Sequence, residues 1–167
     1  TIDEENISLM MGKNCHVVIY PINKNKELNV VCIIREKKYD PDNIKSLVGK
    51  VIAQNSNLEK VFEGDLKSWP LYFTPQILPS TNSKVFYIGD AFNGFLPTLA
   101  QGAGQSIESA FELFNLIQDN KADIQNTYFQ ERSRRAKIVK RRSNINFFVF
   151  HFSSSIMQTL RNFFMKF

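Results

Sequence analysis

Two apolar runs near the N-terminus flank a polar turn, which is the pattern of a β-hairpin. Residues 15–20 and 28–34 are rich in β-branched side chains, and the segment PINKNKE lies between them. The two-residue period of a strand places His16 and Tyr20 on one face of the first run, opposite an apolar face. We therefore expect an antiparallel hairpin within residues 13–36.

A helical period follows this hairpin. Apolar residues recur at helical spacing between residues 40 and 54, and a weaker pattern of the same kind covers residues 59–64. Residues 69–74 form an extended aromatic stretch beside a proline, and we expect them to join the antiparallel sheet. A polar loop is expected between residues 76 and 84.

The stretch VFYIGDAFNGFLPTLAQGAGQSIESA, residues 85–110, places a short apolar run before an acidic turn and a glycine-rich segment. The run VFYI has no polar alternation, which predicts a strand buried on both faces, and Asp90 stands at its carboxyl end. Gly102 and Gly104 predict a loop where the backbone can approach a ligand closely. A helix with an apolar stripe follows, and its N-terminus offers free N–H donors. The stripe is Ile107, Ala110, Phe111, Phe114 and Ile117.

Two further helices are predicted towards the C-terminus. Residues 122–143 predict a basic helix, and residues 145–167 predict a helix rich in phenylalanine. The second has no uninterrupted apolar run near the ~20 residues of a membrane span. We expect it to pack on a partner domain or a second subunit, and an interfacial helix at a membrane surface stays open.

The central stretch resembles the second FAD-binding motif of single-component flavoprotein aromatic hydroxylases, above all the salicylate hydroxylase and 3-hydroxybenzoate 6-hydroxylase branch. Gly89-Asp90-Ala91, Pro97, the QGAG run at 101–104 and the pair Ile107-Glu108 keep the spacing of that motif. The chain departs from it at Phe92-Asn93 and at Ser109. The resemblance implies these FAD-binding residues: Gly89, Asp90, Pro97, Gly102, Ala103, Gly104 and Gln105.

Other segments carry the same resemblance. HVVIYPINKNKELNVV is similar to the H-x-x-x-Y-P run on the substrate side of the flavin, and Tyr128, Arg132 and Arg135 resemble the Y-x-x-x-R-x-x-R run that ends the catalytic domain. The resemblance implies that His16, Tyr20 and Gln101 converge above the flavin. A neutral imidazole would then act as base towards a phenol, Gln101 would orient the phenol oxygen, and Tyr20 would fix the ring.

The implied reaction is the hydroxylation of a phenolic or other small aromatic substrate. NADH or NADPH would reduce FAD, and the reduced flavin would react with O2, while the protein supplies positioning and electrostatics. The sequence has no G-x-G-x-x-G behind an N-terminal strand, so the resemblance covers only the C-terminal part of the family's architecture. We therefore expect a carboxyl-terminal portion that is inactive without an N-terminal Rossmann half; a homodimer stays open.

Charge and cysteine content bear on the partners and the cellular location that we expect. The net charge is +5, yet residues 121–167 hold ten Lys or Arg and only two acidic residues. Such a run can bind nucleic acid or an anionic membrane, but a solvated helix face is the commoner case, so we expect no nucleic-acid partner. Cys15 and Cys32 predict buried free thiols and a cytoplasmic location. His16 and His151 fall in separate regions of the chain, and no metal site is expected.

The predicted fold class is α+β: an antiparallel substrate-domain sheet, an FAD-domain strand and C-terminal helices, a partial flavoprotein hydroxylase fold without the N-terminal Rossmann unit. Residues 1–75 belong to the substrate-binding sheet domain, 76–120 to the second FAD-binding motif, and 121–167 to the basic and aromatic helices. Two other functions stay open. One is another FAD oxidoreductase of the same fold, such as a quinone-pathway hydroxylase or a reductase; the other is a non-catalytic basic protein that binds membranes or nucleic acid.

Overall fold

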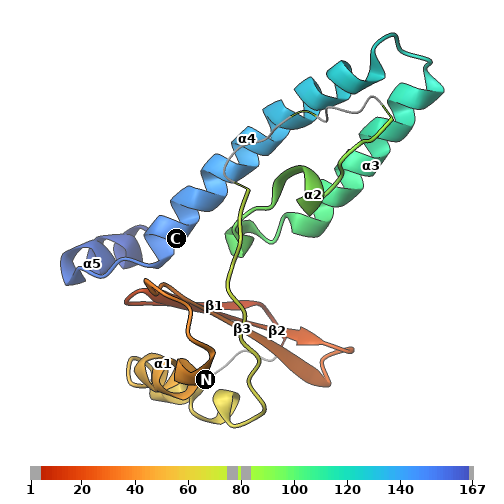
Figure 1. Ribbon diagram of the computed structural model, residues 1–167. Helices are drawn as coiled ribbons and strands as arrows, with labels where there is room; N and C mark the ends of the chain where they lie inside the picture. The colour runs from red at the N-terminus through yellow and green to blue at the C-terminus, as the bar shows by residue number, and fades with distance from the viewer. Residues whose placement is uncertain (1–4, 75–78, 80–83, 166–167) are drawn as a thin grey trace. The chain divides into compact units, whose positions relative to one another are not determined.

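A computed structural model describes residues 5–74, 79 and 84–165, and the chain divides into two compact units (Figure 1). Unit 1 comprises Thr1–Pro70 and Phe148–Phe167, and unit 2 comprises Leu71–Phe147. The predicted C-terminal part therefore contributes to both units. The polar loop expected at 76–84 lies almost wholly outside the described residues.

Unit 1 is built on a three-stranded antiparallel sheet in the order β1-β2-β3. The strands are β1 (Ser8–Gly12), β2 (Cys15–Ile22) and β3 (Glu27–Ile34), so the predicted hairpin is confirmed. Strand β1 was not predicted, because its five residues SLMMG show no alternation. The sequence does carry one signal for this strand, the asparagine at position 14, because asparagine tolerates the positive φ of a tight hairpin turn. In the structure Asn14 has a φ of 57° in the turn between Gly12 and Cys15.

The apolar face of β2 forms the core of unit 1. Cys15, Val17 and Ile19 are buried and pack with Val51 and Leu58. Both cysteines are free, as predicted, but only Cys15 is buried and Cys32 is half-buried. Desolvation raises the pKa of the Cys32 thiol to about 12.

Helical elements cover this face. They are η1 (Pro41–Asn43), α1 (Ile44–Ile52), η2 (Ser56–Leu58) and η3 (Lys60–Phe62). The helix expected between residues 40 and 54 is therefore confirmed, whereas the weaker one expected at residues 59–64 is only the single 3₁₀ turn η3. Asp40 caps the start of η1, since its Oδ1 accepts the Asp42 N–H at 3.0 Å.

Unit 2 consists of two long antiparallel helices and the short elements that precede them (Figure 1). The elements are α2 (Asp90–Asn93), η4 (Pro97–Leu99), α3 (Gly102–Gln118) and the part of α4 (Ile124–Phe150) that ends at residue 147. Phe92, Leu116, Tyr128 and Ala136 form the buried core between them.

The boundary between the last two helices is not where the sequence predicted it. Helix α4 runs on to Phe150, and α5 spans Ser155–Phe164. Nothing at residue 144 interrupts helical hydrogen bonding, whereas residues 153–155 are consecutive serines, which favour turns and caps over helix interiors.

Two predicted strands are wrong. Residues 69–74 and 85–88 have no regular secondary structure, and Val85, Tyr87 and Ile88 are exposed instead of buried on both faces. A strand exists only when a neighbouring strand completes its hydrogen bonds. In the described part of the chain, the only strands are β1, β2 and β3, and none of them pairs with either segment.

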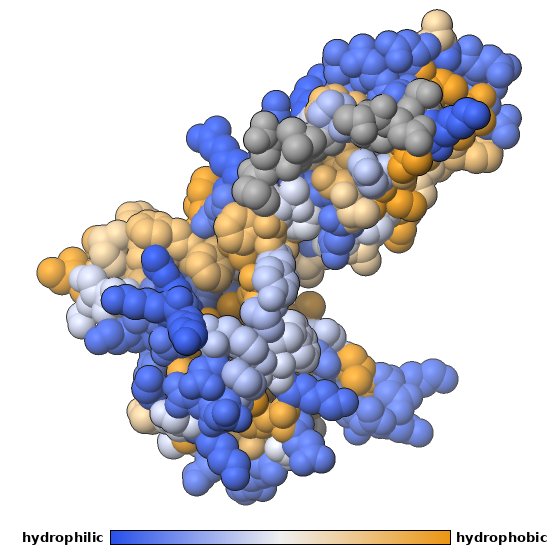
Figure 2. Space-filling model, viewed as in Figure 1, coloured by the Kyte–Doolittle hydropathy of each residue, from blue (hydrophilic) through white to orange (hydrophobic). Residues whose placement is uncertain are grey.

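Several apolar side chains remain uncovered in each unit. On α3, the predicted stripe faces outward, with Ile107 71% and Phe111 64% exposed. On α5, Ile156, Phe163 and Phe164 are exposed, and Figure 2 shows this apolar surface at the left of the view. Within the ranges that the structure describes, no helix combines the length and the apolarity that a membrane span requires.

Candidate functional site

The turn at Gly89 lies directly against the start of α3. Gly89 has a φ of 56°, and its carbonyl accepts the N–H groups of Phe92 and Asn93, each at 3.0 Å. A Cβ at this position would lie 2.5 Å from Ser106 Oγ. Glycine is therefore required twice, by its backbone conformation and by the close approach of α3. Asp90, the first residue of α2, is exposed beside this junction.

The first turn of α3 is uncapped and bare. The helix begins at Gly102, so the prediction that the glycines form a loop before it is wrong; helical hydrogen bonding begins with the Gln105 N–H, which donates to the Gln101 carbonyl at 2.8 Å. Gln101 makes no side-chain cap, which leaves the N–H groups of residues 102–104 without a partner inside the helix.

Neither glycine of this turn is needed for packing. A Cβ on Gly102 would meet nothing within 4 Å, and one on Gly104 would meet only Gln101 Oε1 at 3.9 Å. Alanine would fit at both positions and is the better helix former by up to about 1 kcal/mol. The bare backbone therefore points to a ligand that approaches it closely.

The loop that carries Pro97 is fastened to α4. Thr98 Oγ1 donates to the Ser143 carbonyl at 2.7 Å, and Ser143 Oγ donates to the carbonyl of Leu96. Asn146 Nδ2 donates to the Thr98 carbonyl at 3.4 Å. These contacts fix the path of the chain into Gln101 and the first turn of α3.

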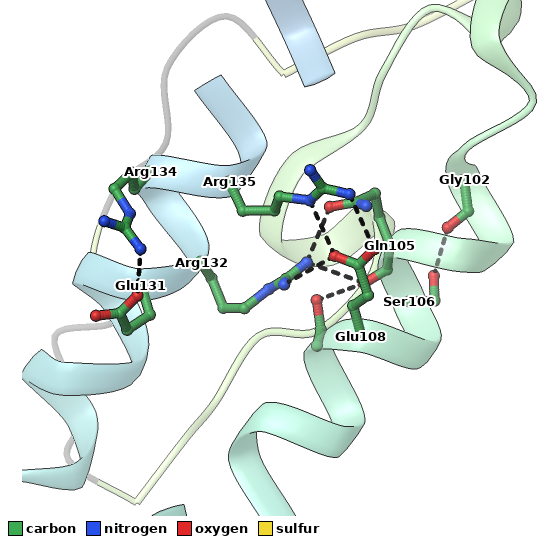
Figure 3. A network of polar contacts seen from close by, with 9 residues as sticks. Gly102, Gln105, Ser106, Glu108, Glu131, Arg132, Arg134 and Arg135 are labelled. Carbon is green, nitrogen blue, oxygen red and sulfur yellow. Dashed lines mark hydrogen bonds and ion pairs between the residues drawn. The ribbon is translucent and has the colours of Figure 1, made fainter. Parts of the chain in front are cut away.

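A second set of contacts fastens the first turn of α3 to α4, as Figure 3 shows. Arg132 Nη2 donates to Gln105 Oε1 at 3.0 Å and to the Gln105 carbonyl at 3.3 Å. Arg132 and Arg135 both pair with Glu108, at 3.3 and 3.2 Å. The hydrogen bond from Arg135, and secondarily that from Arg132, lowers the pKa of the Glu108 carboxyl.

These contacts correct part of the prediction for the basic run. Arg132 is only 6% exposed and braces α3, so it does not belong to a solvated helix face. Arg134 belongs to a solvated helix face, as predicted, because its ion pair with Glu131 lies on the surface. This brace was not predicted from the sequence; the spacing of Arg132 and Arg135, which puts both on one face of a helix, is the signal that could have indicated it.

The two positions where the chain departs from the hydroxylase motif have different environments. Phe92 lies in the core of unit 2, and Ser109 Oγ donates to the Gln105 carbonyl at 2.7 Å, so both are accommodated. Asn93 is buried, and its amide oxygen and nitrogen have no hydrogen-bond partner among the described residues. An unpaired buried amide costs about 1–3 kcal/mol.

His16 occupies the polar face of β2, where it meets His151. His16 Nδ1 lies 3.1 Å from His151 Nε2, which contradicts the expectation that the two histidines lie in separate regions. Phe150 packs on the His16 ring edge to face, with centroids 5.2 Å apart, and His16 is 1% exposed. Burial, and next the charge of His151, lowers the pKa of His16 to about 4. The sequence held no signal for this contact across 135 positions.

The other two predicted substrate residues, Tyr20 and Gln101, lie in different units. Tyr20 lies on the same face of β2 as His16 and is half-buried. Gln101 is exposed and belongs to unit 2. Because Gln101 belongs to the other unit, its convergence with His16 and Tyr20 stays a prediction.

Comparison with known proteins relates the whole chain to flavoenzymes. The family model described as squalene epoxidase matches residues 1–167. Salicylate hydroxylase of Pseudomonas putida is 25% identical over 142 residues, which is 75% of this chain and 32% of the relative. The Streptomyces platensis 3-amino-4-hydroxybenzoate 2-monooxygenase PtmB3 is 27% identical over 165 residues, 91% of this chain and 41% of the relative. The FAD-dependent monooxygenase cfoG of Aspergillus candidus is 31% identical over 145 residues, 77% of this chain and 33% of the relative.

A solved structure titled as a salicylate hydroxylase substrate complex has the same fold. It superposes with a TM-score of 0.72 at 18% identity and covers 95% of this chain and 44% of that chain. The predicted partial hydroxylase fold is thereby confirmed. This chain spans between a third and a half of the length of the proteins that it matches.

Proposed function

This chain belongs to the squalene epoxidase family, and from that premise we propose that it is the C-terminal portion of an FAD-dependent monooxygenase. The proposed substrate is a phenolic or other small aromatic compound, and the proposed co-substrates are O2 and NADH or NADPH. The names of the related proteins, which are hydroxylases and monooxygenases of aromatic acids, support this class of substrate.

One observation carries the proposal, the bare first turn of α3 beside the Gly89 turn. Three N–H groups without a partner inside the helix and the positive end of the helix dipole suit the electron-rich edge of a flavin. The space around Gly102 admits a ligand to the backbone, and the contacts of Arg132 and Thr98 hold that backbone in place. The residues therefore fit FAD.

Each residue of this region has a proposed role. The exposed Asp90 carboxylate would accept hydrogen bonds from hydroxyl groups of the ribityl chain or ribose, while the N–H groups of residues 102–104 would donate to the pyrimidine edge. Donors fixed in this way stabilise negative charge on the ring without reorganising. Pro97 and Ala103 would line the cofactor, and Gln105 would hold the turn through Arg132. Bound FAD supplies the redox and oxygen chemistry.

The proposed substrate contacts are His16, Tyr20 and Gln101. A phenol oxygen needs a hydrogen-bonding partner that favours its ionised form, since the phenolate is the more reactive species towards hydroxylation. His16 Nδ1 already faces His151, so only Nε2 of His16 can face a substrate. Tyr20 lies on the same strand face and would contact the aromatic ring.

We also propose that an N-terminal Rossmann half covers the uncovered parts of unit 2. The relatives are two to three times longer than this chain, and the apolar segment 85–88 and the apolar stripe of α3 are exposed here. Pairing with a parallel sheet would complete the hydrogen bonds of residues 85–88 and bury them on both faces. A cytoplasmic location stays a prediction.

Replacement of Asp90 tests the cofactor site. In the full-length protein, Asp90→Ala should weaken FAD binding at least tenfold, about 1.4 kcal/mol, in a fluorescence titration of the apoprotein. Asp65→Ala, at an exposed aspartate of unit 1, is the control and should leave the affinity unchanged. Equal FAD affinity in both variants would remove Asp90 from the site.

Product analysis separates the alternative functions. A hydroxylated aromatic product formed with NAD(P)H consumption supports the monooxygenase, whereas flavin reduction without oxygen transfer supports another FAD oxidoreductase of this fold. Two residues of the basic run, Arg132 and Arg135, form ion pairs with Glu108, which makes them less available to nucleic acid or a membrane than a non-catalytic basic protein would require.

A further inference from the structure

The buried contact between His16 and His151 raises the question of which nitrogen carries the proton. A hydrogen bond between two neutral imidazoles needs one N–H donor and one bare nitrogen. His16 Nδ1 and His151 Nε2 lie 3.1 Å apart, so one of them is protonated and the other is not. The two alternatives give His16 opposite capabilities at its other nitrogen.

The carbonyl of Ile33 decides between these alternatives. Its oxygen lies 3.3 Å from His151 Nε2, and a carbonyl oxygen only accepts hydrogen bonds. A bare His151 Nε2 would point its lone pair at that oxygen, which is repulsive. A protonated Nε2 instead satisfies both neighbours at once, because an N–H can be shared between two acceptors.

The surroundings of the pair oppose a second proton. His16 and His151 are each 1% exposed, and Phe150 covers the His16 ring. The Arg161 side chain is also buried and donates to the carbonyls of Phe150 and Met11, the latter being the cross-strand partner of His16. Burial in a low dielectric favours the neutral pair, because it disfavours the charged form of an imidazole. Consistent with this, the pKa of His16 is lowered to about 4.

We propose that His151 is a positioning residue for His16: it shares its Nε2–H between His16 Nδ1 and the Ile33 carbonyl, and so keeps the proton of His16 on Nε2. Nδ1 of His16 is then an acceptor that His151 occupies, and Nε2 is an N–H donor. The imidazole cannot accept a proton at a nitrogen that already carries one. His16 would therefore stabilise a bound phenolate by donating to its oxygen, in place of the general-base role that the sequence predicted.

Nuclear magnetic resonance tests the proton position without substrate or flavin. The chain has only two histidines, so an ¹⁵N-labelled sample gives two imidazoles, which His151→Gln assigns. We expect a proton bonded directly to His151 Nε2 and a coupling from that nitrogen across the hydrogen bond to His16 Nδ1. A proton on His16 Nδ1, or no coupling between the two nitrogens, would overturn the proposal.

A second arm rests on the proposed function and uses the full-length enzyme. A hydrogen bond to a charged oxygen is worth ~1.5–3 kcal/mol, so His16→Ala should lower kcat about 10- to 100-fold. His16→Gln, which retains an N–H donor but no base, should recover most of that loss, and kcat should not follow the titration of a base. Failure of His16→Gln to recover any activity would contradict the donor role.

The two arms fail separately. If the wild-type enzyme hydroxylates no aromatic compound, the proposed function is wrong, while the proton position measured on the labelled chain still decides the role of His151.

Discussion

The Tyr128 hydroxyl of α4 donates to the Tyr87 carbonyl at 2.8 Å, two residues before Gly89. Tyr128 is buried, and its ring meets Phe86 and Phe92 edge to face, with centroids 5.8 and 5.9 Å apart. The aromatic residue on α4 therefore holds both sides of the Gly89 turn. Burial raises the pKa of the Tyr128 phenol, so it remains a hydrogen-bond donor.

Removal of this hydroxyl should destabilise unit 2. Tyr128→Phe keeps the ring contacts but leaves the Tyr87 carbonyl without this donor, which should lower the free energy of unfolding by about 1 kcal/mol. Urea denaturation measures the change. Tyr72→Phe is the matched control, because Tyr72 lies in the same unit and is 84% exposed. Equal unfolding midpoints for the two variants would contradict a structural role for the Tyr128 hydroxyl.

Two glycines of the candidate site should respond oppositely to alanine. Gly102→Ala meets no atom and should leave the free energy of unfolding unchanged or raise it by up to about 1 kcal/mol, yet weaken FAD binding because the methyl group fills the approach to the backbone. Gly89→Ala should destabilise by more than about 1 kcal/mol, since it adds backbone strain and a clash with Ser106.

The measurements are thermal unfolding for stability and flavin fluorescence for affinity. A Gly102→Ala protein that binds FAD as tightly as the wild type would show that the bare first turn of α3 serves no flavin.

Replacing Glu108 should lower the free energy of unfolding more than replacing Glu131, although both residues pair with arginine. Glu108→Gln leaves the buried Arg132 without its carboxylate. The loss should be about 1–2 kcal/mol, below the usual value for a fully buried pair because the Glu108 side chain is 40% exposed. Glu131→Gln breaks only a surface pair with Arg134 and should cost less than about 0.5 kcal/mol.

The Glu108 contribution also has a defined pH dependence. Its pKa in the folded protein is lowered, so the stabilisation is present above the ordinary value of 4.5 and is lost as the pH falls through the lowered value. Unfolding of wild type and Glu108→Gln at pH 7 and pH 3 measures this. A difference between the two proteins that does not shrink at pH 3 would contradict the assignment.

Protonation of His16 should lower the stability of unit 1, and this should begin at a higher pH than the loss of the Glu108 contribution. The pKa of His16 is about 4 in the folded protein and 6.5 as the ordinary value, so the unfolded chain binds more protons between these two values. Stability therefore falls as the pH decreases from 6.5 to 4, by about 3 kcal/mol in total and about 1 kcal/mol by pH 5.5. Urea midpoints at pH 7.5 and 5.5 measure the loss, and His16→Gln should flatten the dependence. An unchanged slope in that variant would assign the titration to another group.

The sequence alone determined the features that depend on neighbouring residues. The hairpin of β2 and β3, helix α3 and the placement of Asp90 close to the start of that helix follow from periodicity and from glycine positions within a few residues of one another. Such patterns act through backbone dihedral preferences and side-chain spacing, which are local. The same motif residues gave the resemblance to flavoprotein hydroxylases, and the comparisons confirm it.

The tertiary structure decided what depends on residues far apart in the chain. Periodicity identified the apolar stripe of α3, yet that stripe is exposed, and the buried residues of the helix include the polar Gln105 and Ser109. Arg132 supplies a polar partner for Gln105 from a different helix, which a local pattern cannot indicate. The meeting of His16 with His151 could not be predicted either, since two single residues on separate elements leave no periodic trace. The segment 85–88 has the composition of a strand, but a strand also needs a partner to share its hydrogen bonds, and composition cannot provide one.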